Sequence, residues 1–194
     1  GRPLRIVHRD ISPSNLFVTY QGAVKIIDFG IAKAEGKLAQ TKSGMLKGKL
    51  QYMSPEQVDY KPLDARSDVF ALGVVLYELV TGMRPFQRDE DAETIQAILR
   101  EPFPPASQQL PGVPPELDDI IARALERDAG KRFQSANELR RALEGFLSSR
   151  TTAPIASQLQ EFMLAQMGEE RMRARSSPLS AQSNSGAFPA QPAN

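Results

Sequence analysis

The chain has 194 residues, of which 41% are apolar, enough to build the core of one domain. Its 24 basic and 23 acidic side chains give a formal net charge of +1, which argues against a polybasic nucleic-acid binder. The absence of cysteine and the single histidine exclude disulfides, iron–sulfur clusters and zinc sites built on Cys or several His. The longest nearly apolar run, residues 69–80, is shorter than the roughly 20 residues that a membrane span needs.

Two short apolar and β-branched segments near the start predict strands. They cover residues 16–19 and 24–27, and Gly22 lies in the turn-like stretch between them. Such a pair predicts a β-hairpin. Residues 30–56 lack a clean period and contain four glycines, and a loop of that length is usually functional or disordered.

The rest of the chain up to residue 148 has helical periodicity. Residues 68–80 are apolar nearly all round, which predicts a buried central helix ending at Gly82. Residues 92–100 form an amphipathic segment, which predicts a helix. A Pro pair at 114–115 predicts the start of the next helix. Ser135 and Glu138 form a capping-box pattern, which predicts the start of the last helix before residue 148. The expected fold is mainly α-helical with a small β-hairpin. The last helix should bury one face, made of Leu139, Leu143, Phe146 and Leu147.

Composition changes near residue 150. We expect residues 149–175 to form a C-terminal extension with an amphipathic helix, because five apolar residues share one helical face: Ile155, Leu159, Phe162, Met163 and Met167. A helix packed on the domain is preferred to a partner-binding helix. Residues 176–194 carry no charge and are rich in Ser, Pro, Ala and Gln, so we expect this tail to be disordered.

A group of polar residues flanks the predicted hairpin. Residues 8–10 read His-Arg-Asp, Asn15 follows Asp10 by five positions, and Asp28-Phe29-Gly30 comes directly after the second strand. Each piece alone is a common turn device. In this order and spacing the pieces resemble the catalytic loop and the metal-binding loop of protein kinases.

Further segments extend the resemblance downstream. Residues 52–56 (Tyr-Met-Ser-Pro-Glu) resemble the motif that closes the kinase activation segment, residues 66–73 resemble the start of the central helix, and residues 131–133 resemble a late structural motif. These motifs follow one another in the family's order over about residues 3–148. Their sequences are most similar to those of bacterial Ser/Thr kinases of the eukaryotic type. The resemblance implies a kinase-like C-terminal lobe over residues 1–148, from an α+β family fold, with the small N-terminal lobe missing.

The resemblance also implies roles for the polar residues. Asp10 accepts the proton of the substrate hydroxyl, and Asn15 and Asp28 supply oxygen ligands for Mg²⁺. Phe17 matches the position that packs under the adenine ring of ATP, with a plain core residue as an equally good alternative. His8 matches a structural residue that packs on Phe29.

Three more residues match structural positions of the family. Glu56 and Arg132 match a buried ion pair that holds the activation segment to the helical lobe. Asp68 matches an acid that accepts backbone N–H groups of the catalytic loop, and from the sequence we expect it to be the N-terminal cap of the central helix.

The chain departs from the family pattern in three ways. The Gly-rich loop, the strand Lys and its partner Glu do not precede the His-Arg-Asp motif, so we expect half an active site with poor ATP binding and little or no activity alone. The Lys that usually follows the catalytic Asp by two positions is Ser12, and the Thr that usually follows the activation-segment Gly is Lys49. We hypothesise that Lys49 is catalytic and replaces the missing cation; the alternative is a solvent-facing Lys49.

The expected function is ATP-dependent phosphorylation of a protein substrate on a Ser or Thr hydroxyl, with ATP and Mg²⁺ as cofactors. A non-catalytic pseudokinase or docking module is the alternative, and a small-molecule phosphotransferase with a kinase-like fold is a weaker one. We expect no nucleic-acid partner, no membrane segment in this chain, and a cytoplasmic site of action. A membrane tether or a dimer of the full-length form is left open.

Overall fold

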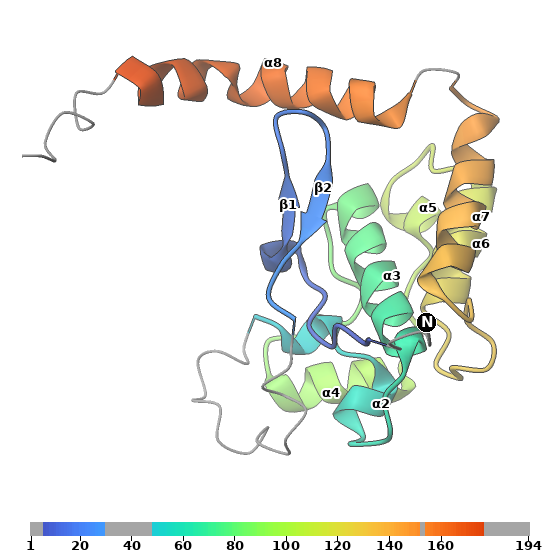
Figure 1. Cartoon of the computed structure of the whole chain (residues 1–194). Helices are drawn as coiled ribbons and strands as arrows, with labels where there is room; N and C mark the ends of the chain where they lie inside the picture. Colours follow the sequence, from blue (N-terminus) through green and yellow to red (C-terminus); the bar gives the residue numbers. More distant parts are fainter. Residues whose placement is uncertain (1–5, 30–47, 152–153, 177–194) are drawn as a thin grey trace, which may run out of the picture. The chain divides into compact units, whose positions relative to one another are not determined.

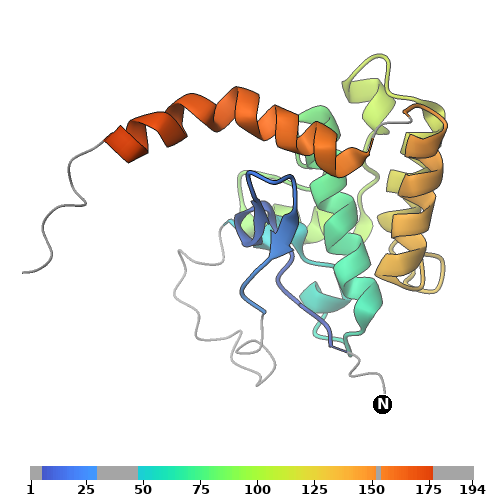
Figure 2. The same ribbon diagram turned by 45° about the horizontal axis from the view of Figure 1, so that its top comes forward.

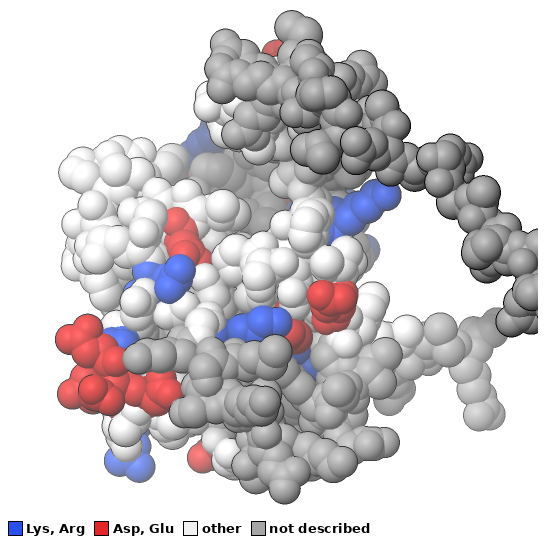
Figure 3. Space-filling view, turned by 90° about the vertical axis from the view of Figure 1, so that its left-hand side faces the viewer, with Lys and Arg blue, Asp and Glu red and all other residues white. Residues whose placement is uncertain are grey.

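The computed structural model describes residues 6–29, 48–151 and 154–176, with side chains up to residue 168. The chain divides into two compact units, one of residues 1–17 and 24–152 and one of residues 18–23 and 153–194. In the described ranges, no helix is long and apolar enough to cross a membrane. On the face shown in Figure 3, basic side chains are scattered, and acidic side chains form one large cluster besides several that stand apart from it.

The predicted hairpin is present and is shorter than expected. It consists of β1 (Leu16–Val18) and β2 (Val24–Ile26), preceded by the 3₁₀ turn η1 (Pro13–Asn15). Gly22 adopts φ 75° in the turn, a conformation that glycine reaches without strain. The turn is closed by the backbone bond from Thr19 N–H to the Ala23 carbonyl, at 2.8 Å.

The central helix is α3 (Ala65–Thr81), and Figures 1 and 2 show the other helices of the lobe arranged around it. It is buried along most of its length, as its apolar sequence predicts, and Gly82 ends it at φ 72°. The helix begins three residues earlier than expected, because the Asp64 side chain accepts the Arg66 N–H and caps it. The expectation that Asp68 is the N-terminal cap is therefore wrong.

Three longer helices of the lobe match the sequence-based expectation closely. They are α4 (Asp91–Arg100), α6 (Pro115–Ala124) and α7 (Ala136–Ser148). Ser135 caps α7 as expected, by accepting the Glu138 N–H. The second half of the capping box differs, because the Glu138 carboxylate accepts the Gln134 N–H and not that of Ser135. Leu139 is buried, while the other apolar residues of that face are partly buried.

Several short elements are not apparent from hydrophobic periodicity. They are η4 (Leu50–Tyr52), α2 (Pro55–Val58) and α5 (Ala106–Gln109). Helix α2 begins with a complete capping box, in which Ser54 accepts the Gln57 N–H and the Gln57 side chain accepts the Ser54 N–H. Element η4 contacts both α3 and α4. The segment after residue 47 is thus attached to the helical lobe.

The core of the lobe lies on the buried sides of α3, α4 and α6. Its largest residues include Phe70 and Phe86, whose rings stack at 5.6 Å, together with Tyr77, Ile98 and Ile121. A smaller cluster joins α3 to α7 through Val69, Ala124, Phe133 and Leu139. These clusters make α3 the frame to which the functional loops can attach.

Helix α8 (Ile155–Ser176) occupies the range in which an amphipathic helix was expected. It belongs to the unit that also holds residues 18–23. Several of its apolar side chains are substantially exposed, namely Ile155, Phe162, Leu164 and Met167. The tail expected to be disordered, 176–194, lies almost wholly outside the described residues.

Candidate active site

The loop of residues 8–15 is attached to the first turn of α3 through Asp68. The Asp68 carboxylate accepts the backbone N–H of His8 at 2.7 Å and that of Arg9 at 2.9 Å. Burial raises the pKa of Asp68, and the two backbone hydrogen bonds oppose that rise because they favour the charged form. Asp68 therefore makes the contacts expected of it, from inside the helix and not from the cap position.

His8 joins this loop to the end of strand β2. Its Nδ1 accepts the Asp10 N–H at 3.3 Å, and its Nε2 lies 3.1 Å from the Ile27 carbonyl. These two contacts require a neutral ring with the proton on Nε2. The ring also packs on Phe29, with centroids 4.7 Å apart, so the structural role expected for His8 is confirmed.

Arg9 has a left-handed backbone (φ 66°), which turns the chain between His8 and Asp10. Its carbonyl accepts a hydrogen bond from the Gln57 side chain at 2.9 Å. Helix α2 thereby adds a second attachment for the loop. This role of Gln57 is not among those predicted from the sequence, although the Ser-Pro-Glu-Gln capping pattern indicates that Gln57 lies at the start of a helix.

Asn15 connects Asp10 with strand β2. Its side-chain NH₂ donates to the Asp10 backbone carbonyl at 2.7 Å and to Asp10 Oδ2 at 3.2 Å. The Asn15 backbone carbonyl accepts the Ile27 N–H at 3.0 Å. Asn15 is buried, with 4% of its surface exposed. These bonds bring Asp10, Asn15 and the residue after Ile27, Asp28, to one end of the hairpin.

Asp28 has a left-handed backbone (φ 57°) and an exposed side chain. Among the described residues, no cluster of three or more His, Cys, Asp or Glu could hold a metal by itself. Asp28 and Asn15 nevertheless provide the hard oxygen donors that Mg²⁺ takes, and such sites use one or two side chains plus phosphate oxygens and water. The Asn15 NH₂ is used by Asp10, which leaves Oδ1 as the available ligand, with the Ser14 hydroxyl 3.5 Å away. The donor atoms of the two residues are thus of the kind that Mg²⁺ takes.

The part of the loop between Asp10 and Asn15 carries no cation. The hydroxyls of Ser12 and Ser14 lie 2.9 Å apart and hydrogen-bond to each other, and Ser12 is buried. The position where the family pattern has a Lys is therefore a closed polar contact.

Lys49 reaches this place from another segment. Its Nζ lies 2.5 Å from Asp10 Oδ2, although 39 residues separate the two. The Asp10 side chain is mostly buried and that of Lys49 is one-third exposed, at 11% and 33%. The alternative that Lys49 points into solvent is excluded by this contact.

The segment that carries Lys49 is also fixed to the lobe through Tyr52. The Tyr52 hydroxyl donates to Glu78 Oε2 on α3 at 2.5 Å, and Arg84 pairs with the other Glu78 oxygen at 2.7 Å. Burial, followed by the bond to Glu78, raises the pKa of Tyr52 far above its ordinary value. No sequence pattern indicates the Tyr52–Glu78 contact.

The predicted ion pair between Glu56 and Arg132 is present. Both guanidinium NH groups bond the carboxylate at 2.7 Å, and Arg132 is buried. Burial by itself raises the pKa of Glu56, but hydrogen bonds from Arg132 and Ser67 outweigh it and leave the pKa lowered. This pair holds α2, and with it the end of the loop segment, to the helical lobe.

Phe17 is 51% exposed on strand β1. The described residues therefore do not bury Phe17 in the core of the lobe. Its neighbours on the hairpin and after it are also exposed apolar residues, including Val24, Ile26 and Phe29. An apolar surface of this kind is available for a flat, apolar ligand group.

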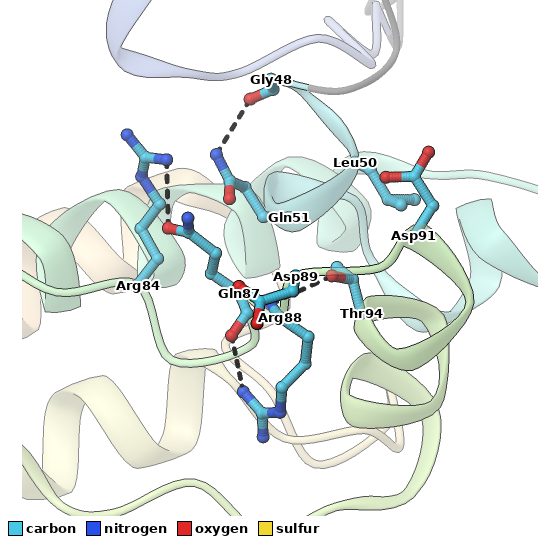
Figure 4. A pocket seen from close by; sticks show the side chains of 9 residues that line it. All are labelled: Gly48, Leu50, Gln51, Arg84, Gln87, Arg88, Asp89, Asp91 and Thr94. Atoms are coloured by element: carbon cyan, nitrogen blue, oxygen red, sulfur yellow. Dashed lines mark hydrogen bonds between the residues drawn. The ribbon is translucent and has the colours of Figure 1, made fainter. Parts of the chain in front are cut away.

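A polar cavity of about 190 Å³ lies beside the segment that carries Lys49. Figure 4 shows its lining, which comes from the residues around Gly48, the loop after α3 and the start of α4. Its two basic groups are paired, Arg84 with Glu78 and Arg88 with Glu101. The Gln51 side chain donates to the Gly48 carbonyl at 3.1 Å and fixes the backbone next to Lys49.

Comparisons with known proteins agree with this geometry. Residues 3–143 match the protein kinase domain model. The chain is 47% identical over 176 residues to the tyrosine-protein kinase MasK of Myxococcus xanthus, which covers 91% of this chain and 27% of that protein. It is 41% identical over 155 residues to the probable serine/threonine-protein kinase SCO3848 of Streptomyces coelicolor, covering 78% and 23%. A third relative, serine/threonine-protein kinase PknA of Corynebacterium glutamicum, is 42% identical over 69% of this chain and 28% of its own length.

The chain thus spans about a quarter of the length of these relatives. Its helical lobe and two-stranded sheet agree with the C-terminal lobe expected from the sequence. Loop 8–15, the acid after β2 and the Glu56–Arg132 pair stand in the order that the kinase pattern requires. With a family match over most of its residues, the chain belongs to the protein kinase family.

Proposed function

We propose that this site transfers the terminal phosphoryl group of ATP to a Ser or Thr hydroxyl of a protein substrate. The observation that carries the proposal is the pair of hydrogen bonds from the Asn15 side chain to Asp10, together with the bond from the Ile27 N–H, next to Asp28, to the Asn15 backbone carbonyl. One buried residue, through its side-chain amide and its backbone carbonyl, thus links the proton acceptor to the segment that carries Asp28. Phosphoryl transfer depends on such positioning, because the chemistry itself needs little covalent help from the protein.

Each polar residue has a separate role in the proposal. Asp10 accepts the proton of the attacking hydroxyl, for which a carboxylate held by Asn15 and Lys49 is well oriented. Asn15 and Asp28 hold Mg²⁺, which neutralises charge on the phosphates when it is bound. Phe17 provides the apolar surface under the adenine ring, and its 51% exposure supports this role.

A tyrosine hydroxyl is the second candidate acceptor. The relative that is 47% identical carries the name tyrosine-protein kinase. Ser12 also replaces the loop Lys that is usual in Ser/Thr kinases. Phosphoamino-acid analysis of a phosphorylated substrate separates the two, because only one acceptor class should dominate.

We also propose that the 194 residues alone are inactive. They contain no Gly-rich loop and no strand Lys, the groups that cover and hold ATP phosphates in kinases. The retained Asp10, Asn15 and Asp28 favour a catalytic full-length protein over a pseudokinase or docking module. The coding sequence before Gly1 provides a direct check, since a Gly-rich loop and a strand Lys there would complete the site.

The experiment compares the full-length protein with its Asp10→Asn and Asp28→Asn variants, using radiolabelled ATP, Mg²⁺ and a general protein substrate. We expect incorporation by the wild type and loss of about 100-fold or more in each variant. The isolated 194 residues should show no more label than their own Asp10→Asn variant. Equal labelling by the full-length wild type and Asp10→Asn would contradict the proposal and favour the pseudokinase.

The cellular setting belongs to the same proposal. A protein substrate and ATP are the expected partners, and the site is expected to act in the cytoplasm. Fractionation of cells that produce the full-length protein tests this location and also reports a membrane tether. Its elution volume on size exclusion reports whether the full-length form is a dimer.

A further inference from the structure

The cation beside Asp10 comes from a segment distant in sequence. The loop that carries Asp10 has Ser12 where the family pattern has Lys, and the Ser12 hydroxyl is engaged by Ser14. The ammonium of Lys49 fills the gap, at 2.5 Å from Asp10 Oδ2. An ammonium has three N–H donors, so the bond to Asp10 leaves donors for a second anion.

The backbone of Lys49 is held in place by the lobe. Lys49 is the residue just before η4, and its carbonyl accepts the Tyr52 N–H at 3.1 Å. Leu50, Gln51 and Tyr52 are all buried, and Tyr52 is bonded to Glu78 on α3. The Lys49 side chain is thus aimed at Asp10 from a fixed base.

The exposure of the pair suggests a chemical role more than a structural one. One-third of the Lys49 side chain is accessible, so the pair stands at the open edge of the site. A partly exposed ion pair contributes little to stability. A fixed cation beside a proton acceptor is worth more in the transition state, where charge develops on the transferred group.

We propose that Lys49 is the catalytic cation of this kinase, supplied by the segment leading into η4 in place of the loop that carries Asp10. This inference rests on the proposed function. The substrate hydroxyl oxygen forms a bond to the terminal phosphorus of ATP while the bond to the bridging oxygen breaks. The hydroxyl proton goes to Asp10, ADP leaves with the electron pair, and Lys49 donates to the oxygens of the transferred phosphoryl group.

This arrangement makes the cation dependent on η4. A Lys on the loop of residues 8–15 would lie on the loop that Asp68 attaches to α3 through His8 and Arg9. Lys49 depends instead on the Tyr52–Glu78 bond, so Tyr52 is a positioning residue for the cation. Loss of the Tyr52 hydroxyl should lower the rate of phosphoryl transfer when Lys49 provides the cation. It should matter much less when a Lys at position 12 provides it.

The first experiment measures kcat and KM of the full-length protein with Lys49→Gln. We expect kcat to fall about 100-fold while the KM for ATP changes less than about threefold. Lys61→Gln is the matched control, because Lys61 is also paired with a nearby acid, Asp59 at 2.7 Å, and both side chains of that pair are well exposed. A Lys49→Gln rate equal to that of Lys61→Gln would overturn the inference, and so would a rate increase, which would make Lys49 an inhibitor of Asp10.

A second variant guards against misfolding. These 194 residues contain no cysteine, so within them only the new thiol of Lys49→Cys is alkylated when the full-length variant is treated with 2-bromoethylamine, which restores an ammonium at nearly the same length. The full-length Lys49→Gln variant treated with the same reagents is the control for cysteines outside these residues. We expect the alkylated protein to regain at least one-tenth of the wild-type kcat, and alkylation with iodoacetamide, which adds no charge, to restore none. Equal recovery with both reagents, or with neither in a folded protein, would contradict the proposed cation.

The third experiment moves the cation. Ser12→Lys in the Lys49→Gln background should recover activity, and Tyr52→Phe should then cost much less than it does in the wild type. Additive effects of these changes would count against the inference.

The proposed function and the inference can be told apart. If Asp10→Asn loses activity while Lys49→Gln keeps it, the function is supported and Lys49 is not the catalytic cation. A full-length wild type without activity would overturn both.

Discussion

Lys49 Nζ lies 2.5 Å from Asp10 Oδ2, and both residues are held by the same helix, α3. Asp68, in the first turn of α3, holds the loop of Asp10, while Glu78, near the other end, holds Tyr52 and the segment of Lys49. Ten positions along a helix span about 15 Å. Helix α3 is therefore a common frame for the two loops, and α2, which follows η4, also bonds the loop of Asp10 through Gln57.

Removal of the Asp68 carboxylate should misplace Asp10. In Asp68→Ala the N–H groups of His8 and Arg9 lose their acceptor, and we expect kcat of the full-length protein to fall about 10- to 100-fold. Asp64→Ala is the matched control, because Asp64 caps the same helix without touching that loop. It should lower stability by about 1 kcal/mol and leave kcat within twofold. Similar kcat losses in both variants would contradict the positioning role.

The Glu56–Arg132 pair should make stability depend on pH. The folded-state pKa of Glu56 lies below its ordinary value of 4.5, so the pair's contribution is complete above that pH. It is lost as the pH falls through the lower, folded-state pKa. Urea unfolding of the chain between about pH 6 and 3 measures this loss. In Glu56→Gln the decline over the same window should be smaller.

The same variant should be less stable than the wild type at neutral pH. Arg132 is buried, and Glu56→Gln leaves its charge without an anionic partner, at a cost of about 3 kcal/mol. Arg140→Gln serves as control, because its ion pair with Glu144 is exposed and should contribute less than about 1 kcal/mol. A Glu56→Gln protein as stable as the wild type at pH 7 would show that the pair does not hold α2.

Two glycines in helices should respond in opposite directions to alanine. A Cβ on Gly73 in α3 would lie 2.9 Å from the Ala124 Cβ and 3.0 Å from Leu125 Cδ2, so Gly73→Ala should cost about 1–3 kcal/mol by overpacking. A Cβ on Gly145 in α7 meets nothing within 4 Å. Gly145→Ala should therefore stabilise the chain by about 0.5–1 kcal/mol. Urea midpoints compare the two, and stabilisation by both changes would refute close packing of α3 on α6.

Phe17 should affect ATP binding more than turnover. Phe17→Ala removes the apolar surface proposed to lie under the adenine ring, and we expect the KM for ATP of the full-length protein to rise about tenfold with kcat nearly unchanged. Leu79→Ala is a suitable control, since Leu79 is 77% exposed on α3. An unchanged KM for ATP would remove Phe17 from the nucleotide site.

Much of the fold follows from local sequence patterns. The central helix, the amphipathic helices and the hairpin each have a period, a cap or a turn residue within a few positions, and Gly82 and Ser135 act where their chemistry predicts. The short elements η4, α2 and α5 were missed because three or four residues show no period. The start of α3 was misplaced because its first turn is polar and its cap, Asp64, precedes the apolar run.

The sequence by itself determined the kinase family and which residue types stand at Asp10, Asn15 and Asp28, because their order and spacing along the chain are specific. Only the tertiary structure decided which side chains meet across long separations. Lys49 on Asp10, Tyr52 on Glu78 and Gln57 on the Arg9 carbonyl join segments 26 to 48 residues apart. No local pattern encodes such pairs, because they arise only when separate segments pack against one helix and one core.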